Sequence, residues 1–241
     1  CKNNFVVCER FYVVSNGYQV YFSKDLDPEI NGARMMVPQW FELDNVGIHL
    51  SESSSTHILM PILEQKAAAV KVGLRKLGRE LLLFLHKLRH FTAALEDVPV
   101  LDVTRTDQPI GSWYGGRQRV TSLEDTSPCQ GSSPIVVKYW VHTEELQLPK
   151  ELSEPGRCAG QVCRTTAVSI ALALDCPAAR ASTAGMLFTY LPLEERLPRL
   201  PAIINATFEL TASRESLKPN NAWNSFHYQA LPGVYVNAFL G

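Results

Sequence analysis

Residues 185–217 constrain the fold of this chain more than any other stretch, because they contain two apolar segments that alternate with a period of two. The first segment covers residues 186–191 and the second residues 202–211, and the Leu-Pro pairs at 197–198 and 200–201 lie between them. In the second segment every other residue is apolar, and most of the intervening residues are polar. This pattern is typical of a half-buried strand in an antiparallel sheet. We therefore expect two strands joined by a proline-containing loop.

Periodicity elsewhere predicts further strands and one long helix. Residues 5–22 predict a hairpin, because Asn16-Gly17 suits a two-residue turn in which both positions take positive φ. Leucines recur at intervals of three and four from residue 64 to 92, which predicts an amphipathic helix, and Gly73 and Gly78 weaken its middle. The other predicted strands are 56–63, 98–105, 134–142 and 161–174, and the predicted loops are 106–134, 146–160 and 176–185.

These elements together predict an α/β (α+β) fold. We expect a two-layer sandwich in which a mixed, mainly antiparallel sheet is covered by the long helix at 64–92. Residues 1–96 would form the first segment and residues 97–241 a second α/β or β-rich segment. With 241 residues and 46% apolar composition, the chain is long enough for one large or two small cores.

Composition argues against several classes of partner and compartment. The formal net charge of −1 provides no basic field for nucleic acid, and the longest apolar runs are too short to span a bilayer. No signal peptide is visible. The six cysteines are thinly spread, which favours reduced thiols in the cytoplasm or the nucleus. The chain begins with Cys1 and not with Met, so we expect a piece of a longer protein.

Several short stretches, in the same order along the chain, resemble the sacsin/No Vein family. These stretches are SNGYQVYF (15–22), THILMPIL (56–63), ELLLFLHKLR (80–89), Leu-Pro-Leu (191–193), Leu-Pro (200–201), Asn205 and Ser-Arg-Glu (213–215). The family carries a GHKL-type (Bergerat) ATPase fold, similar to the nucleotide domain of the large heat-shock chaperones. The resemblance implies that residues 1–96 are the back half of such a domain and that residues 97–241 are the segment following it.

The resemblance also implies nucleotide-binding residues. Thr56 matches the threonine that opens a strand and helps bind adenine, and Lys2 matches a lysine of the phosphate-facing loop. Arg214 would reach toward the nucleotide, as arginines of chaperone middle domains do, or would instead form a salt bridge with Glu215. The implied cofactor of the intact protein is ATP with Mg²⁺. The sequence departs from the family at Cys1 and Asn3 and has Met-Pro-Ile at 60–62 in place of Leu-Pro-Leu.

The catalytic part of such a fold would lie upstream of this chain. The sequence contains no Asp-x-Gly-x-Gly, no Gly-x-Gly-x-x-Gly and no Walker-type loop, and therefore offers no backbone cradle for a triphosphate. We expect no catalytic residue in this chain, no cofactor bound to it alone, and ATPase activity only as part of a longer protein.

Two functional hypotheses from different classes follow. The first is a fragment of a nucleotide-gated, chaperone-like regulatory protein of the sacsin/No Vein type, whose partners would be protein clients or other domains of the same protein. The second is a non-catalytic interaction or scaffold module. A third reading, a zinc-dependent hydrolase, would use His86 and His90, which are four residues apart on the predicted helix. Residues 113–119 mix aromatic and basic side chains, as single-strand binders do, and we interpret them as a surface turn.

Overall fold

The computed structural model divides the chain into two compact units, Cys1–Lys76 and Leu77–Gly241. Each unit is described by itself. The structure describes residues 7–15, 17–23, 38–42, 56–95, 98–113, 116–127, 133–153, 155–158, 161–162, 164–175, 177, 181, 183–197, 200–211 and 216–240.

The first unit is built on a four-stranded antiparallel sheet followed by a helix. Its sheet has the order β3-β2-β1-β4. The elements are β1 (Arg10–Ser15), β2 (Tyr18–Ser23), β3 (Gln39–Trp40), β4 (His57–Leu59) and α1 (Glu64–Arg75). β1 and β2 form the predicted hairpin, and Gly17 has the positive φ of 84° that the turn requires. The stacked rings of Phe11 and Phe22, with centroids 4.8 Å apart, form part of the core of this unit.

The second unit contains an eight-stranded sheet with the order β13-β12-β14-β11-β8-β7-β6-β5. Its strands are β5 (His90–Leu95), β6 (Val98–Trp113), β7 (Gly116–Asp125), β8 (Ile135–Gln147), β11 (Thr165–Ala173), β12 (Met186–Thr189), β13 (Leu191–Arg196) and β14 (Ile203–Ala206). The neighbours are antiparallel except for β12 and β14, which are parallel. The smaller elements are η4 (Arg79–Leu82), η5 (Lys150–Leu152), β9 (Pro155–Cys158) and β10 (Gln161–Val162), and α3 (Ala222–Leu240) follows β14. The predicted class, α+β with mixed, mainly antiparallel sheets, is therefore confirmed.

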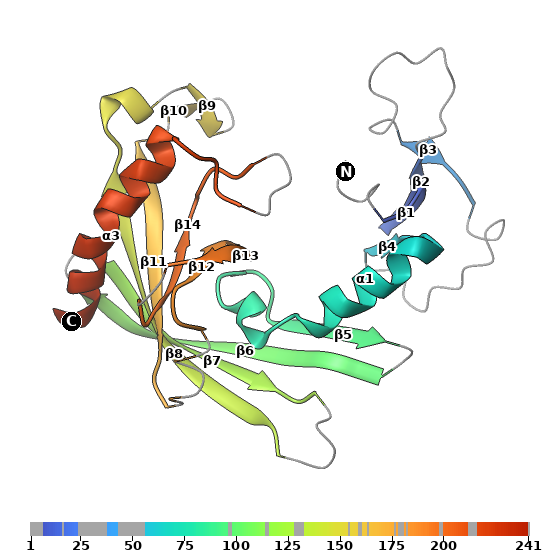
Figure 1. Ribbon diagram of the computed structural model, residues 1–241, viewed down its shortest axis with the longest axis horizontal. Helices are drawn as coiled ribbons and strands as arrows, with labels where there is room; N and C mark the ends of the chain where they lie inside the picture. Colours follow the sequence, from blue (N-terminus) through green and yellow to red (C-terminus); the bar gives the residue numbers. More distant parts are fainter. Residues whose placement is uncertain are drawn as a thin grey trace. The chain divides into compact units, whose positions relative to one another are not determined.

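Helix α3 covers one face of the eight-stranded sheet (Figure 1). Ile170 of β11 and Ile204 of β14 pack with Leu231 and Val234 of α3 in one buried apolar cluster. Phe208 belongs to the same cluster, and its ring contacts Tyr228 on the helix. Polar contacts add to this packing, because His227 Nε2 lies 3.2 Å from the Thr166 hydroxyl of β11 and Asn237 donates to Glu144 of β8 over 3.1 Å.

The opposite face of the sheet is covered by η4 and the residues that follow it. Leu82, Leu83 and Phe84 are completely buried. The ring of Phe84 meets the ring of Phe188 on β12 edge to face, with centroids 5.2 Å apart. On β8, the hydroxyl of Tyr139 donates a hydrogen bond to Glu80 of η4 over 2.9 Å. The centre of the apolar run at 81–85 is therefore buried, as its composition indicates, and Leu81 and Leu85 at its ends are partly buried.

The predicted helix over residues 64–92 is wrong in its extent. Helix α1 ends at Arg75, Gly78 is extended (φ −102°, ψ 158°), and the chain enters strand β5 at His90. The two glycines lower the helix propensity of this region, and the leucines after them gain more by packing on the sheet than by continuing the helix. The long helix that covers a sheet is α3.

The predicted loop at 106–134 is also wrong over much of its length, and the predicted loop at 146–160 contains the end of β8 and the short strand β9. Strands β6 and β7 pair continuously through the first of them, apart from an irregularity at Pro109, and β8 extends to Gln147. Their polar residues hide the alternation, but backbone pairing between long antiparallel neighbours does not depend on it. Strands β5 and β6, on either side of the predicted boundary at 96–97, pair with each other. The assignment of two segments to parts of a GHKL-type protein stays a prediction.

The stretch 185–217 differs from its prediction in two ways. Strand β14 ends at Ala206, and all four of its residues are buried, so it is a central strand covered on both faces and not a half-buried one. An additional edge strand, β13, lies within the predicted loop. Gly185 begins this region with a φ of 69°, and a Cβ there would lie 1.9 Å from the carbonyl oxygen of Leu197. Only glycine fits that position.

Candidate functional site

Thr56 is the only residue of the implied nucleotide site that lies within the described part of the chain. It immediately precedes β4, is exposed, and its hydroxyl lies 2.6 Å from the hydroxyl of Ser15 at the end of β1. Its hydroxyl is therefore held at a strand end, where it can both donate and accept. Lys2 and Arg214 lie outside the described residues.

The zinc interpretation of His86 and His90 is wrong in its geometry. The two residues do not share a helix, because His86 follows η4 and His90 begins β5. His90 Nε2 lies 2.6 Å from Asp102 Oδ1, and this hydrogen bond is the main reason that the pKa of Asp102 is below its ordinary value. Within the described ranges, no group of three or more His, Cys, Asp or Glu side chains is placed to hold a metal.

A cluster of arginines on β6 and β7 is an organised polar feature of the second unit. Arg105 is at its base, with a side chain only 1% exposed. Its guanidinium donates hydrogen bonds to the carbonyl oxygens of Leu82, Leu85 and His86 over 2.8, 2.6 and 2.7 Å. Leu82 is the last residue of η4, and the carbonyl oxygens of Leu82 and Leu85 also accept backbone N–H groups, from Leu85 over 3.3 Å and from Leu88 over 3.0 Å. Arg105 therefore adds a side-chain donor to each of the three carbonyl oxygens and ties this segment to β6.

Asp107 connects the arginines of this cluster. Its carboxylate accepts a hydrogen bond from Thr121 over 2.8 Å and forms ion pairs with Arg89, Arg105 and Arg119 at 2.5, 3.2 and 3.6 Å. Burial alone would raise its pKa. The hydrogen bond from Thr121 and the neighbouring guanidinium groups outweigh burial, so the pKa of Asp107 lies below its ordinary value. Asp107 is therefore ionised at neutral pH.

A pocket of about 310 Å³ opens beside this cluster. It is lined by His86, Pro109, Arg117, Gln118, Arg119 and Thr143. Arg117 and Arg119 lie on the same face of β7, and the strand register places Thr143 of β8 directly opposite Arg117. The pKa of His86 is lowered, first by burial and then by the charges of Arg119 and Arg105, so its imidazole is neutral at neutral pH.

Sequence patterns did not predict this pocket. Arg117 and Arg119 fall in the stretch interpreted as a surface turn, and the only role that the sequence suggests for His86 is that of a zinc ligand. A signal was present, because charged or hydroxyl residues recur at every second position in 105–107 and again in 117–121. That spacing places them on one face of each strand. Only the pairing of β6 with β7 brings the two sets together.

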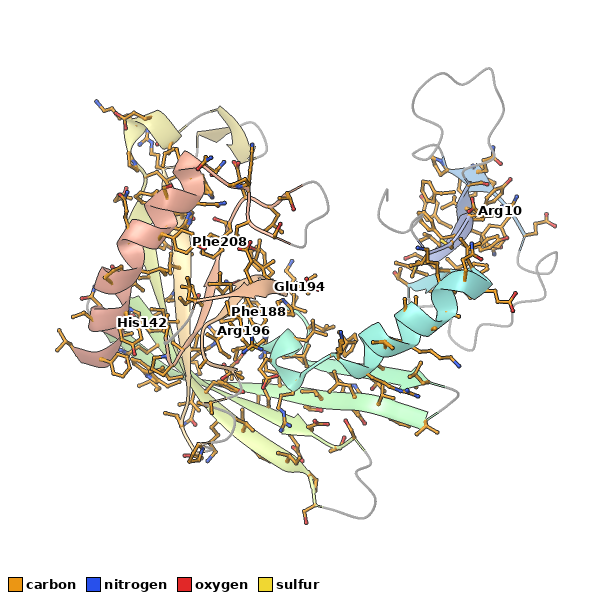
Figure 2. The ribbon with its side chains drawn as sticks, viewed as in Figure 1. Arg10, His142, Phe188, Glu194, Arg196 and Phe208 are labelled. Atoms are coloured by element: carbon orange, nitrogen blue, oxygen red, sulfur yellow. The ribbon has the colours of Figure 1, made fainter. Side chains whose placement is uncertain are left out.

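A second feature is the strained turn between β12 and β13. Tyr190 has a positive φ of 63°, which is uncommon for a residue other than glycine, and its side chain is 48% exposed. The backbone N–H of Tyr190 donates to Oδ1 of the buried Asn205 over 2.8 Å, which holds the turn in place. Figure 2 shows Glu194 and Arg196 on β13, which follows this turn, and Phe208 on the side facing α3. The mid-strand asparagine of the family resemblance thus has a structural role.

Comparisons of the chain with models of protein families, with curated proteins and with solved structures found no match. In the part of the chain that the structure describes, no helix is long and apolar enough to cross a membrane.

Proposed function

We propose that this chain is part of a nucleotide-gated, chaperone-like regulatory protein of the sacsin/No Vein type. In this proposal the first unit contributes one wall of an ATP–Mg²⁺ site, and the partners are protein clients or other domains of the same protein. The observation that carries the proposal is the exposed Thr56 hydroxyl, which Ser15 holds beside the first residue of β4. A hydroxyl in that position can complete the hydrogen bonds of an adenine edge.

The chain itself would not be catalytic. Its sequence has none of the glycine-rich loops that supply backbone N–H groups to a triphosphate. We therefore expect this chain alone to bind ATP weakly or not at all. Hydrolysis would require the acidic helix and the Mg²⁺-binding asparagine that the family carries upstream.

The test compares two lengths of the protein. Isothermal titration calorimetry would measure ATP binding to this chain and to a longer chain that includes the residues encoded upstream of Cys1. We expect binding only by the longer chain. Thr56→Val should weaken it about fivefold, which corresponds to one lost hydrogen bond, whereas Thr56→Ser keeps the hydroxyl and the affinity. Equal affinity of the valine and serine variants would exclude the proposed role of Thr56.

The second candidate, a non-catalytic interaction or scaffold module, is favoured by a different observation. Tyr190 presents an exposed aromatic ring from a strained backbone position that a buried asparagine maintains. Strain of this kind is found mainly where a residue has a task other than folding. If the longer chain binds no ATP, the interaction or scaffold module replaces the nucleotide-gated protein as the favoured function.

A further inference from the structure

The pocket beside Arg119 has the features of a preformed anion site. It involves three separate parts of the second unit, because His86 follows η4, Arg117 and Arg119 lie on β7, and Thr143 lies on β8. Its volume of about 310 Å³ is at the lower end of the range for small-molecule sites. A pocket of this size admits a small charged group and excludes a large ligand.

Hydrogen bonds hold one edge of the Arg119 guanidinium in place. Its Nε donates to the Thr121 hydroxyl over 3.1 Å, and its Nη2 donates to the carbonyl oxygen of Leu83 over 3.4 Å. Asp107 lies 3.6 Å from Nε, and the side chain is only 18% exposed. Among the described residues, Nη1 has no hydrogen-bond acceptor. A guanidinium held in this way offers a donor whose orientation is already set, so a ligand need not order it.

Arg117 differs from Arg119 in its exposure. Its side chain is 74% exposed, and its ion-pair partner Glu145, at 3.7 Å, is 61% exposed. An exposed pair of this kind contributes little to stability. Arg117 can therefore leave Glu145 for a ligand in the pocket at small cost.

The charges around the pocket do not balance. Ion pairs link the guanidinium groups of Arg89, Arg105 and Arg119 to Asp107, and that of Arg117 to Glu145. Among these ion-paired residues of the described part of the chain, four positive groups thus stand against two negative ones, a surplus of two positive charges. A carboxylate would neutralise one of them, whereas a phosphate monoester carries about two negative charges at neutral pH.

We propose that the pocket lined by His86, Arg117, Arg119 and Thr143 binds the phosphate group of a small phosphate monoester. Arg119 and Arg117 donate to the phosphate oxygens, and the neutral imidazole of His86 supplies one further N–H. The Thr143 hydroxyl, 2.8 Å from the hydroxyl of Ser169, lies beside them. The site is in the second unit and is independent of Thr56 and of any nucleotide bound through it.

The test is a titration of the full 241-residue chain with inorganic phosphate, glycerol 3-phosphate and acetate at low salt, followed by calorimetry. We expect saturable binding of both phosphates and much weaker binding of acetate. Arg119→Gln should reduce the phosphate affinity about tenfold or more, and Arg117→Gln about threefold to tenfold. The Nε–H resonance of Arg119 should shift during the same titration.

The matched control is Lys138→Gln. Lys138 also carries one positive charge on β8, but it pairs with Asp175 and lies on the other face of the strand from Thr143. This control should retain the wild-type affinity. Because Arg117 is exposed, its variant tests the site even if Arg119→Gln fails to fold.

Three results would overturn the proposal. The first is no saturable binding of phosphate, and the second is an equal loss of affinity in Arg117→Gln and Lys138→Gln. The third is binding of acetate as tight as that of the two phosphates, which would assign the pocket to a carboxylate. Thr56→Val should leave phosphate binding unchanged, so failure of the nucleotide proposal and failure of this one are distinguishable.

Discussion

The two faces of the eight-stranded sheet are covered in different ways. On one face, α3 packs through apolar side chains such as Ile204, Leu231 and Val234. On the other face, η4 and the segment after it pack through Leu82–Phe84, and Arg105 of β6 also donates to three of their carbonyl oxygens. A helix brings its own backbone hydrogen bonds to the sheet, whereas an irregular segment must find donors elsewhere.

This difference explains where the buried charges of the second unit lie. The guanidinium of Arg105 serves the irregular segment, and Asp107 compensates the charge that Arg105 introduces. Asp107 also pairs with Arg89 and Arg119, so the buried charge of Arg105 is part of an array of ion pairs. Arg119 of this array lines the pocket. The polar character of the candidate site follows from how the segment is attached to the sheet.

The largest effect is expected when the polar attachment is removed. Arg105→Met would remove the side-chain donor from three carbonyl oxygens and one of the three cations paired with Asp107, and we expect a loss of about 3–5 kcal/mol in the free energy of unfolding. Urea denaturation followed by tryptophan fluorescence would measure it. Arg117→Gln, an exposed arginine of the same cluster, should change stability by less than about 0.5 kcal/mol. If both substitutions cost the same, the two faces do not differ as described.

A cavity on the apolar face should cost somewhat less. Ile204 is completely buried beneath α3, and Ile204→Ala should lower the free energy of unfolding by about 3 kcal/mol. The conservative change Ile204→Val should cost only about 1 kcal/mol. A loss that follows the size of the deleted group identifies packing as its cause. An Ile204→Val variant as unstable as Ile204→Ala would indicate another mechanism.

The smallest effect is a dependence of stability on pH. A histidine on each face contributes to it, and the one on the α3 face contributes more. His227 of α3 is completely buried; its Nδ1 donates to the carbonyl oxygen of Trp223 over 2.8 Å, and its Nε2 lies 3.2 Å from the Thr166 hydroxyl. Burial lowers its pKa below the ordinary 6.5, although the bond to Trp223 opposes this. The unfolded chain therefore takes up a proton first as the pH falls, and stability declines below about pH 6.5.

Denaturation midpoints measured between neutral and acidic pH would test this. His86 on the other face also has a lowered pKa, but its residue is exposed. His227→Gln should remove most of the decline, and His86→Gln a smaller part. Each unit of separation between the folded and unfolded pKa values is worth about 1.4 kcal/mol. A decline unchanged in His227→Gln would mean that other groups cause it.

The sequence alone determined the features that depend on near neighbours. Asn16-Gly17 specifies a tight turn, and the hairpin of β1 and β2 is present. The all-apolar run at 81–85 predicts burial, and Leu82, Leu83 and Phe84 are completely buried. The alternating segments predict strands, and the α+β class is correct. In each case the signal lies within a few residues of the structure that it specifies.

The tertiary structure decided the rest, because it depends on which distant residues meet. The leucines after Gly78 suit a helix as well as an irregular cover, and only the sheet beneath them selects the second. Strand β14 is covered on both faces because α3 and the segment after η4 lie on opposite sides of the sheet, a fact that its own alternation does not contain. Arg105, Asp107 and Arg119 meet only because β6 pairs with β7 in one register. Local patterns specify faces and turns, whereas a site built from several strands requires the pairing itself.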